Sequence, residues 1–168
     1  MLSKKMETAI NDQMNFEIYS GYIYLAMGAY MDSLDLAGFA NWMKVQYDEE
    51  FFHAKKMYDF ILERGGRPFY TQIPEPPKDW ESVKAAFKHA LEHERIVTGR
   101  INDLMTLAIE EKDYASRSFL NWYVDEQVEE ESNVDAIIKQ LNMIKDSGHG
   151  VFMLDKELGT RVFAPPVK

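Results

Sequence analysis

Apolar side chains recur every three or four residues along four long stretches of this chain, the period expected of helices that bury one face. The four stretches span residues 3–33, 38–65, 80–110 and 113–144. Gly65 and Gly66, with Pro68 close behind them, predict the end of the second helix. The pattern therefore predicts an all-α protein built from four long helices.

The connections between these helices differ in length, and the difference sets the helix directions. The first and third connections are only a few residues long, so each joins antiparallel neighbours. The middle connection, residues 66–79, contains Pro74, Pro76 and Pro77, which keep it extended. A helix of about 28 residues is roughly 42 Å long, and about 14 extended residues reach up to roughly 50 Å. We therefore predict a four-helix bundle at about 3–144 with one long crossover, which leaves helices two and three parallel.

A short segment follows the bundle. The run 147–150 contains two glycines and interrupts the fourth helix, and apolar Val151, Leu154 and Leu158 then predict a short C-terminal fifth helix at about 148–159. A single short helix outside a finished bundle has little to bury its apolar face against. It either folds back on its own subunit or packs against copies of itself, and the pattern leaves both alternatives open.

Polar side chains interrupt the apolar stripe near the middle of every long helix. Glu17 and Glu94 interrupt the first and third stripes, and each is followed 33 residues later by a polar pair at positions i and i+3. The pairs are Glu50 with His53, and Gln127 with Glu130. Residues three apart on a helix face the same way, so these six side chains are predicted to converge inside the bundle.

Such convergence predicts a metal site. Ionised carboxylates in a bundle core cost several kcal/mol unless something pairs with them, and the four stripes hold one His and no Lys or Arg. The simpler alternative, acids that lean out to solvent or make core hydrogen bonds, needs the same coincidence on four helices. Carboxylates with one imidazole and no thiolate favour Fe(II), Mn(II) or Zn(II).

Two metal ions fit this set of side chains. Glu17, Glu50 and His53 would hold one ion, and Glu94 would hold the other, with Glu50 as a bridge. Glu130 would be a flexible extra carboxylate.

Two uncharged residues complete the candidate site. Gln127 is neutral, so it is a weak ligand or a hydrogen-bond donor to bound water or dioxygen. Tyr24 lies two turns beyond Glu17 on the same face, where it either packs in the core, hydrogen-bonds a ligand or loses an electron during oxidation.

Further acids lie beside the stripes. Glu49, Glu126 and Glu129 are each one position from a candidate ligand, which rotates them by about 100° around their helices. They are either a solvated charge run or, together, a third and looser metal site. The remaining titratable residues of interest are expected at the surface: His89, Glu92, His93 and His149.

Composition narrows the class of protein. The 168 residues suffice for one domain, 1–168, with a sizeable core. The chain has no Cys, which excludes disulfides, Cys-based zinc sites, iron–sulfur clusters and thiol catalysis, and suits a reducing compartment.

The first residues lack an apolar leader, and no apolar run is long enough to span a membrane, so we expect a cytoplasmic protein. A net charge of −9 and a pI near 4.9 argue against nucleic acid and anionic membranes as partners.

The candidate ligands resemble those of prokaryotic non-haem ferritins. The resemblance covers essentially the whole chain and is carried by Glu17, Glu50-Phe51-Phe52-His53, Glu94, Gln127-Val128-Glu129-Glu130, Tyr24 and Trp122. It implies a ferritin-like bundle in a homo-oligomeric shell of 24 subunits with octahedral symmetry. It also implies a ferroxidase, an oxidoreductase that oxidises Fe(II) with dioxygen or peroxide at a di-iron centre and stores the ferric mineral inside.

The same resemblance implies a third iron site at Glu49, Glu126, Glu129 and Glu130, and a fifth helix that lines the fourfold axis. Bacterioferritins have a second Glu-x-x-His pair where this chain has Gln127 and Glu130, and their haem-binding Met would fall near Phe52, so no haem is expected. Animal ferritins place acids along the threefold pore, but here Arg117 and Leu120 align there, which leaves the iron entry route open.

Two other functions are compatible with the same ligands. One is a Zn or Mn scaffold protein without redox chemistry, in which the centre only holds its ions. The other is a di-iron oxygenase acting on an organic substrate, which needs an apolar pocket that Phe16, Phe51 and Phe52 would crowd.

Overall fold

A computed structural model describes residues 1–145 and 147–165, and within these ranges the chain forms five α-helices and no strand. The helices are α1 (Lys4–Ser33), α2 (Ala37–Glu63), α3 (Val83–Glu110), α4 (Tyr114–Ile144) and α5 (Gly148–Leu158). The all-α prediction is confirmed. The largest shift is at the start of α3, because the Ser82 hydroxyl accepts a hydrogen bond from the Ala85 amide at 3.1 Å and caps the helix there. Within the described ranges, no helix combines the length and apolar character needed to cross a membrane.

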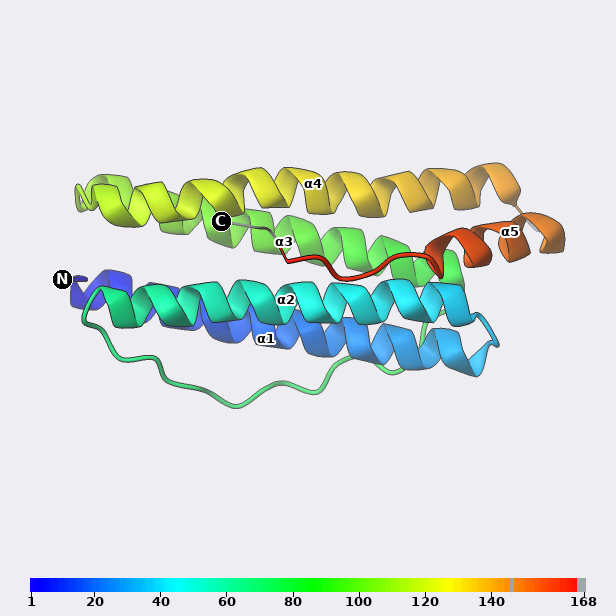
Figure 1. The fold of residues 1–168 in the computed structure, drawn as a ribbon, viewed down its shortest axis with the longest axis horizontal. Coiled ribbons are helices and arrows are strands. Elements are labelled where there is room, and N and C mark those ends of the chain that lie inside the picture. The colour runs from blue at the N-terminus through cyan, green and yellow to red at the C-terminus, as the bar shows by residue number, and fades with distance from the viewer. Residues whose placement is uncertain (146, 166–168) are drawn as a thin grey trace.

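The four long helices lie side by side as a bundle (Figure 1). Short turns join α1 to α2 and α3 to α4, so each pair is antiparallel, whereas the long connection from α2 runs back along the bundle before α3 begins. Helices α2 and α3 therefore point the same way, which confirms the predicted crossover.

The crossover is extended but is tied to α1 by two asparagines. The Asn11 side chain accepts from the Phe69 amide at 2.8 Å and donates to the Arg67 carbonyl at 3.1 Å. One turn later, Asn15 accepts from the Thr71 amide at 2.8 Å. A strand-like segment with no neighbouring strand would leave its backbone groups to water alone, so these side chains fix the path of the crossover along α1.

The buried apolar side chains form two clusters, one towards each end of the bundle. One cluster includes Met27, Phe39 and Phe87, and the other includes Met6, Met57 and Leu120. Between the clusters lies a belt of buried polar side chains: Gln13, Glu17, Gln46, Glu50, His53, Glu94, Gln127 and Glu130. The apolar clusters hold the four helices together on both sides, and the belt sits in a fixed frame.

Helix α5 packs against its own subunit. Leu154 and Leu158 are buried, and the Asp155 carboxylate accepts from the backbone amides of Gly38 and Phe39 at 2.7 and 3.0 Å. This contact caps α2, whose own N-cap residue makes no side-chain cap. A Cβ at position 38 would lie 1.6 Å from the Asp155 carbonyl oxygen, so only glycine permits the approach. The buried face of the fifth helix therefore folds back on its own subunit, which was the first of the two alternatives.

The outer face of α5 remains exposed. Phe152 and Met153 are 56% and 54% exposed, and Met143 on the adjoining end of α4 is 76% exposed. Exposed apolar side chains of this kind are compatible with association between subunits. The second alternative therefore remains open for this face alone.

Candidate metal centre

The six candidate ligands of the bundle core come from all four long helices. Helix α1 carries one, α3 carries one, and α2 and α4 carry a pair each. None of the six is more than 4% exposed: Glu17, Glu50, His53, Glu94, Gln127 and Glu130. The structure thus brings the interruptions of the four apolar stripes to one level of the bundle.

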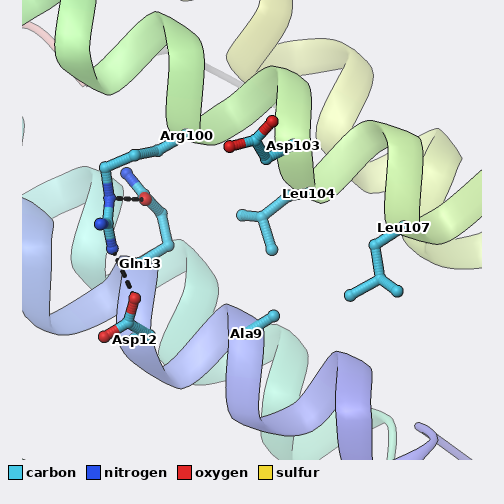
Figure 2. A pocket seen from close by; sticks show the side chains of 7 residues that line it. All are labelled: Ala9, Asp12, Gln13, Arg100, Asp103, Leu104 and Leu107. Atoms are coloured by element: carbon cyan, nitrogen blue, oxygen red, sulfur yellow. Dashed lines mark hydrogen bonds and ion pairs between the residues drawn. The ribbon is translucent and has the colours of Figure 1, made fainter.

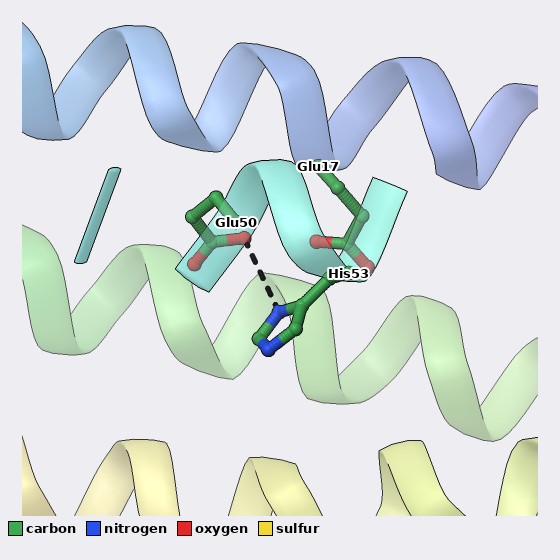
Figure 3. A group of neighbouring side chains, drawn as sticks. All are labelled: Glu17, Glu50 and His53. Carbon is green, nitrogen blue, oxygen red and sulfur yellow. Dashed lines mark ion pairs between the residues drawn. The ribbon is translucent and has the colours of Figure 1, made fainter. Parts of the chain in front are cut away.

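Glu17, Glu50 and His53 form the first of two close groups (Figure 3). One possible ligand atom from each lies within 4.8 Å of the others. The Nδ1 atom of His53 is 3.6 Å from Glu50 Oε2, and Glu17 reaches the pair from the neighbouring helix. The Oε2 atoms of Glu17 and Glu50 are buried and accept no hydrogen bond from any described residue. Buried oxygens without donors are costly, so this group fits a bound cation.

His53, Glu126 and Glu130 form the second group, again with ligand atoms within 4.8 Å of one another. The Nε2 atom of His53 lies 3.8 Å from Glu126 Oε1, so the two imidazole nitrogens face two different sets of carboxylates. Gln46 donates to Glu130 Oε2 at 2.9 Å. The imidazole is therefore the side chain that the two groups share.

Glu94 belongs to neither group, and protein donors hold both of its carboxylate oxygens. The Tyr24 hydroxyl donates to Oε1, and the Gln127 amide donates to Oε2 at 3.2 Å. Gln127 thus acts as a hydrogen-bond donor, one of the two roles considered for it, and its partner is a carboxylate. Tyr24 combines core packing with a hydrogen bond to a candidate ligand.

The acids expected at a looser third site are only partly brought together. Glu126 and Glu130 lie in the second group, whereas Glu129 is exposed and joins no group among the described residues. Glu49 is half-buried, and its Oε2 atom accepts from Arg161 Nη2 at 2.6 Å. A residue of the C-terminal segment therefore competes for one of the four predicted carboxylates.

In the absence of metal, burial is the main cause of the shifted pKa values of the carboxyl groups in the centre. It raises the pKa of the Glu17, Glu50 and Glu94 carboxyls, and burial beside the Glu94 charge raises the pKa of Glu130 to about 8. Burial alone would lower the pKa of His53, but the Glu126 and Glu50 carboxylates beside it raise that pKa well above its usual range. The metal-free centre therefore retains protons that a metal ion must displace.

Two buried glutamines support the centre and were not anticipated as site residues. Gln46 holds Glu130, and Gln13 donates to Glu17 Oε1 at 2.9 Å. Arg100 in turn donates to Gln13 Oε1 at 2.7 Å, at the edge of a surface pocket of about 200 Å³ between α1 and α3 (Figure 2). Position 13 is one turn before Glu17 on the same stripe, which was the available signal.

The surface expectation for His93 is wrong. This side chain is 4% exposed, its Nε2 atom lies 2.7 Å from the Ser20 hydroxyl, and its ring stacks on Phe16 at a centroid distance of 5.3 Å. Burial lowers the pKa of His93 to about 4. Position 93 does not belong to the apolar stripe that carries Glu94. It lies on another side of α3, and α1 buries that side as well.

The other three expectations of this kind hold in different degrees. Glu92 and His149 are exposed, as expected. His89 is half-buried and accepts a hydrogen bond from Trp80 Nε1 at 3.0 Å.

Comparisons with known proteins identify a family and relatives of this chain. Residues 7–144 match the family described as Ferritin, ferritin-like domain. A bacterial non-heme ferritin of Staphylococcus haemolyticus is 45% identical over 163 residues, which cover 97% of this chain and 98% of that protein. A bacterial non-heme ferritin of Staphylococcus aureus is 43% identical over the same length and the same shares of both chains.

Solved structures give the same answer for the fold. An open pore ferritin from the archaeon Archaeoglobus fulgidus superposes with a TM-score of 0.96 at 50% identity, covering 96% of this chain and 100% of that one. A form of the same ferritin engineered to be closed has a TM-score of 0.97 at 50% identity, covering 98% and 100%. The ferritin-like fold prediction is confirmed.

Proposed function

This chain belongs to the ferritin family, with bacterial non-haem ferritins among its relatives, and on that premise we propose that it is an iron-storage protein with ferroxidase activity. Each subunit oxidises Fe(II) with dioxygen or peroxide at the centre inside its bundle. The ferric oxyhydroxide mineral accumulates in the hollow of a homo-oligomeric shell of 24 subunits with octahedral symmetry. The protein works in the cytoplasm.

One observation carries this proposal. Two buried carboxylate oxygens, Glu17 Oε2 and Glu50 Oε2, face an imidazole and have no donor among the described residues. A side-chain network evolved only for packing would satisfy these oxygens with hydrogen bonds, as Tyr24 and Gln127 satisfy Glu94. The arrangement supports a cation as the missing partner of the first group.

The donor set suits iron as a substrate. Carboxylate oxygens and one imidazole nitrogen bind Fe(II), and their negative charge favours Fe(III) over Fe(II), which makes loss of an electron easier. The apolar clusters on both sides keep bulk water from the centre. The raised pKa values of the carboxyls mean that protons leave as iron binds.

Several residues serve this proposal without lying in the first group. Tyr24 and Gln127 orient Glu94, which takes part in holding a second iron ion when these hydrogen bonds rearrange. Glu126 and Glu130, with the other face of His53, supply a third position from which ferric iron moves towards the cavity. Glu49 and Glu129 complete that position as more distant acids.

The test is the fast absorbance rise that follows aerobic addition of Fe(II) to the assembled protein. Glu17→Ala and His53→Ala should slow this rise at least tenfold, because each removes a ligand atom that the other groups do not replace. Glu92→Ala, on the exposed side of α3, is the matched control and should leave the rate unchanged. Unchanged rates in both site variants would rule out this centre as the ferroxidase. A shell that binds Zn(II) at these residues but does not oxidise Fe(II) would favour a non-redox metal scaffold.

A further inference from the structure

The segment that follows α5 turns back and runs along α2 (Figure 1). The Asn41 side chain donates to the carbonyls of Leu158 and Arg161 at 3.2 and 2.9 Å. Further on, the Phe163 ring meets Phe52 edge-on at a centroid distance of 6.2 Å. Positions 41 and 52 lie on one face of the helix, three turns apart. The segment is therefore anchored at two points, and Glu49 lies between them.

Arg161 places a positive charge on this face. Its Nη2 atom donates to Glu49 Oε2 at 2.6 Å, and its guanidinium stacks over the Trp42 ring at 4.7 Å. Both side chains of the ion pair are 22% exposed, so water screens the pair less than it would at an open surface. The structure holds the cation in one defined position.

The ion pair is nevertheless incomplete. A guanidinium normally binds a carboxylate through two parallel N–H donors, but here only Nη2 contacts Glu49. The Nη1 atom is buried and has no acceptor among the described residues. A buried donor without a partner reduces the net stability of such a pair. The contact is thus well placed but is weaker than a two-pronged one.

Glu49 faces acids as well as Arg161. The negative charge of Glu49 repels that of Glu130, and the negative charge of Glu126 repels that of Glu49. Those two acids form the close group with His53, whereas Glu49 does not belong to that group. Arg161 therefore holds a fourth carboxylate close to this group but outside it.

We propose that Arg161 is a built-in counter-cation that competes with metal ions for Glu49 and thereby sets how tightly the His53–Glu126–Glu130 group binds a divalent cation. This inference rests on the proposed function, because it concerns the third iron position of that scheme. When an ion binds, Glu49 exchanges the guanidinium for the ion. The exchange keeps the third ion weakly bound, so that iron passes on towards the mineral.

The test is calorimetric titration of the assembled, metal-free protein with Zn(II), which has the same charge as Fe(II) and is not oxidised. Arg161→Gln keeps most of the side chain but removes the charge, and should tighten the weakest class of Zn(II) sites about tenfold, since one charge-assisted hydrogen bond no longer competes. Arg161→Lys keeps the charge and should stay within about threefold of the parent protein. An unchanged isotherm for Arg161→Gln would overturn the proposal.

Glu49 provides the specific control. In a Glu49→Gln background, Arg161→Gln should have no further effect on Zn(II) affinity, because the carboxylate for which the two cations compete is gone. An equal tightening with and without Glu49 would show a general charge effect and would also overturn the proposal.

A second route to the same result avoids any change at Arg161. Asn41→Ala removes both hydrogen bonds that anchor the segment, and should tighten the same Zn(II) class by about threefold, the equivalent of one weak hydrogen bond. A weaker or unchanged affinity would contradict the proposal. Because Zn(II) binding needs no oxidation, loss of the Arg161 effect and loss of ferroxidase activity are separate outcomes.

Discussion

The two halves of the centre, one on α1 and α2 and the other on α3 and α4, use equivalent helix positions. They differ in how many of their carboxylate oxygens accept hydrogen bonds from the protein. In the first half, Glu17 and Glu50 each have an oxygen without a donor among the described residues, next to His53. In the second half, Tyr24 and Gln127 satisfy both oxygens of Glu94. A cation entering the first half breaks no hydrogen bond to these two oxygens and replaces only the longer contact of Glu50 with His53, whereas one bound by Glu94 must displace a protein donor. The comparison indicates a tight first position and a weaker second one.

The largest expected effect tests directly whether the first metal position is tighter than the second. Glu17→Ala should weaken the tightest Zn(II) site at least 100-fold, more than the loss of an outer supporting partner usually costs. Glu94→Ala should weaken the same site about tenfold or less, because Glu94 acts there only through its neighbours. Calorimetric titration of both variants measures the difference. Equal losses would mean that the two glutamates are equivalent ligands.

The pH dependence of the metal-free protein sharpens the comparison for Glu130. In the unfolded chain this carboxyl ionises near its ordinary pKa of 4.5, but in the folded protein its pKa is about 8. The protonated group therefore favours the folded state fully below pH 4.5, and this contribution is lost as the pH rises towards 8. Glu130→Gln cannot ionise, so at pH 8 it should be more stable than the parent by on the order of 4 kcal/mol.

Thermal unfolding followed by circular dichroism measures this gain. The melting temperature of Glu130→Gln should exceed that of the parent by about 10 °C at pH 8 and should approach it at pH 4.5. Glu92→Gln, exposed on α3, is the control. A difference that did not change with pH would contradict the assigned ionisation.

Gln127→Glu tests why the second half is weaker. The substitution replaces the amide that donates to Glu94 with a carboxylate, as at position 50 of the first half. The second Zn(II) ion should bind about tenfold tighter, and the metal-free protein should unfold at a lower temperature because two buried acids then face each other. Titration and melting curves check both. Tighter binding without a loss of metal-free stability would show that Gln127 does not act as a neutral donor.

The smallest effect concerns α5, which caps the first half of the bundle. Asp155→Ala removes the acceptor for the Gly38 and Phe39 amides, and should cost about 1 kcal/mol of stability, the usual value of a lost helix cap. The affinity of the tightest Zn(II) site should not change, because the cap lies far along α2 from Glu50. A loss of affinity in this variant would mean that the ligand geometry depends on the cap.

Periodicity anticipated the arrangement of the main side chains because the helices themselves impose it. Residues three apart share a face, so Glu50 and His53 had to point together, and the stripes placed Glu17 opposite them. The same reasoning failed for His93, because a stripe on one face of α3 does not reveal that α1 covers a second face.

Contacts between residues far apart in the chain lay beyond this reasoning. The pair of Arg161 with Glu49 joins positions 112 apart, and its formation depends on the path of an irregular segment. Gln13 and Gln46 were visible only as polar positions in apolar stripes, and their partners became clear once the helices were placed. The side on which α5 packs depended likewise on the single glycine at position 38.

The cap that Asp155 provides also sets an order of events during synthesis. The Gly38 amide donates to the Asp155 carboxylate, and this acceptor is made 117 residues later in the chain. At the usual rate of 5–20 residues per second, this separation corresponds to roughly 6–23 s of translation. The first two helices therefore leave the ribosome with one end of α2 unfinished. This end of α2 receives its cap only when the C-terminal helix has been made.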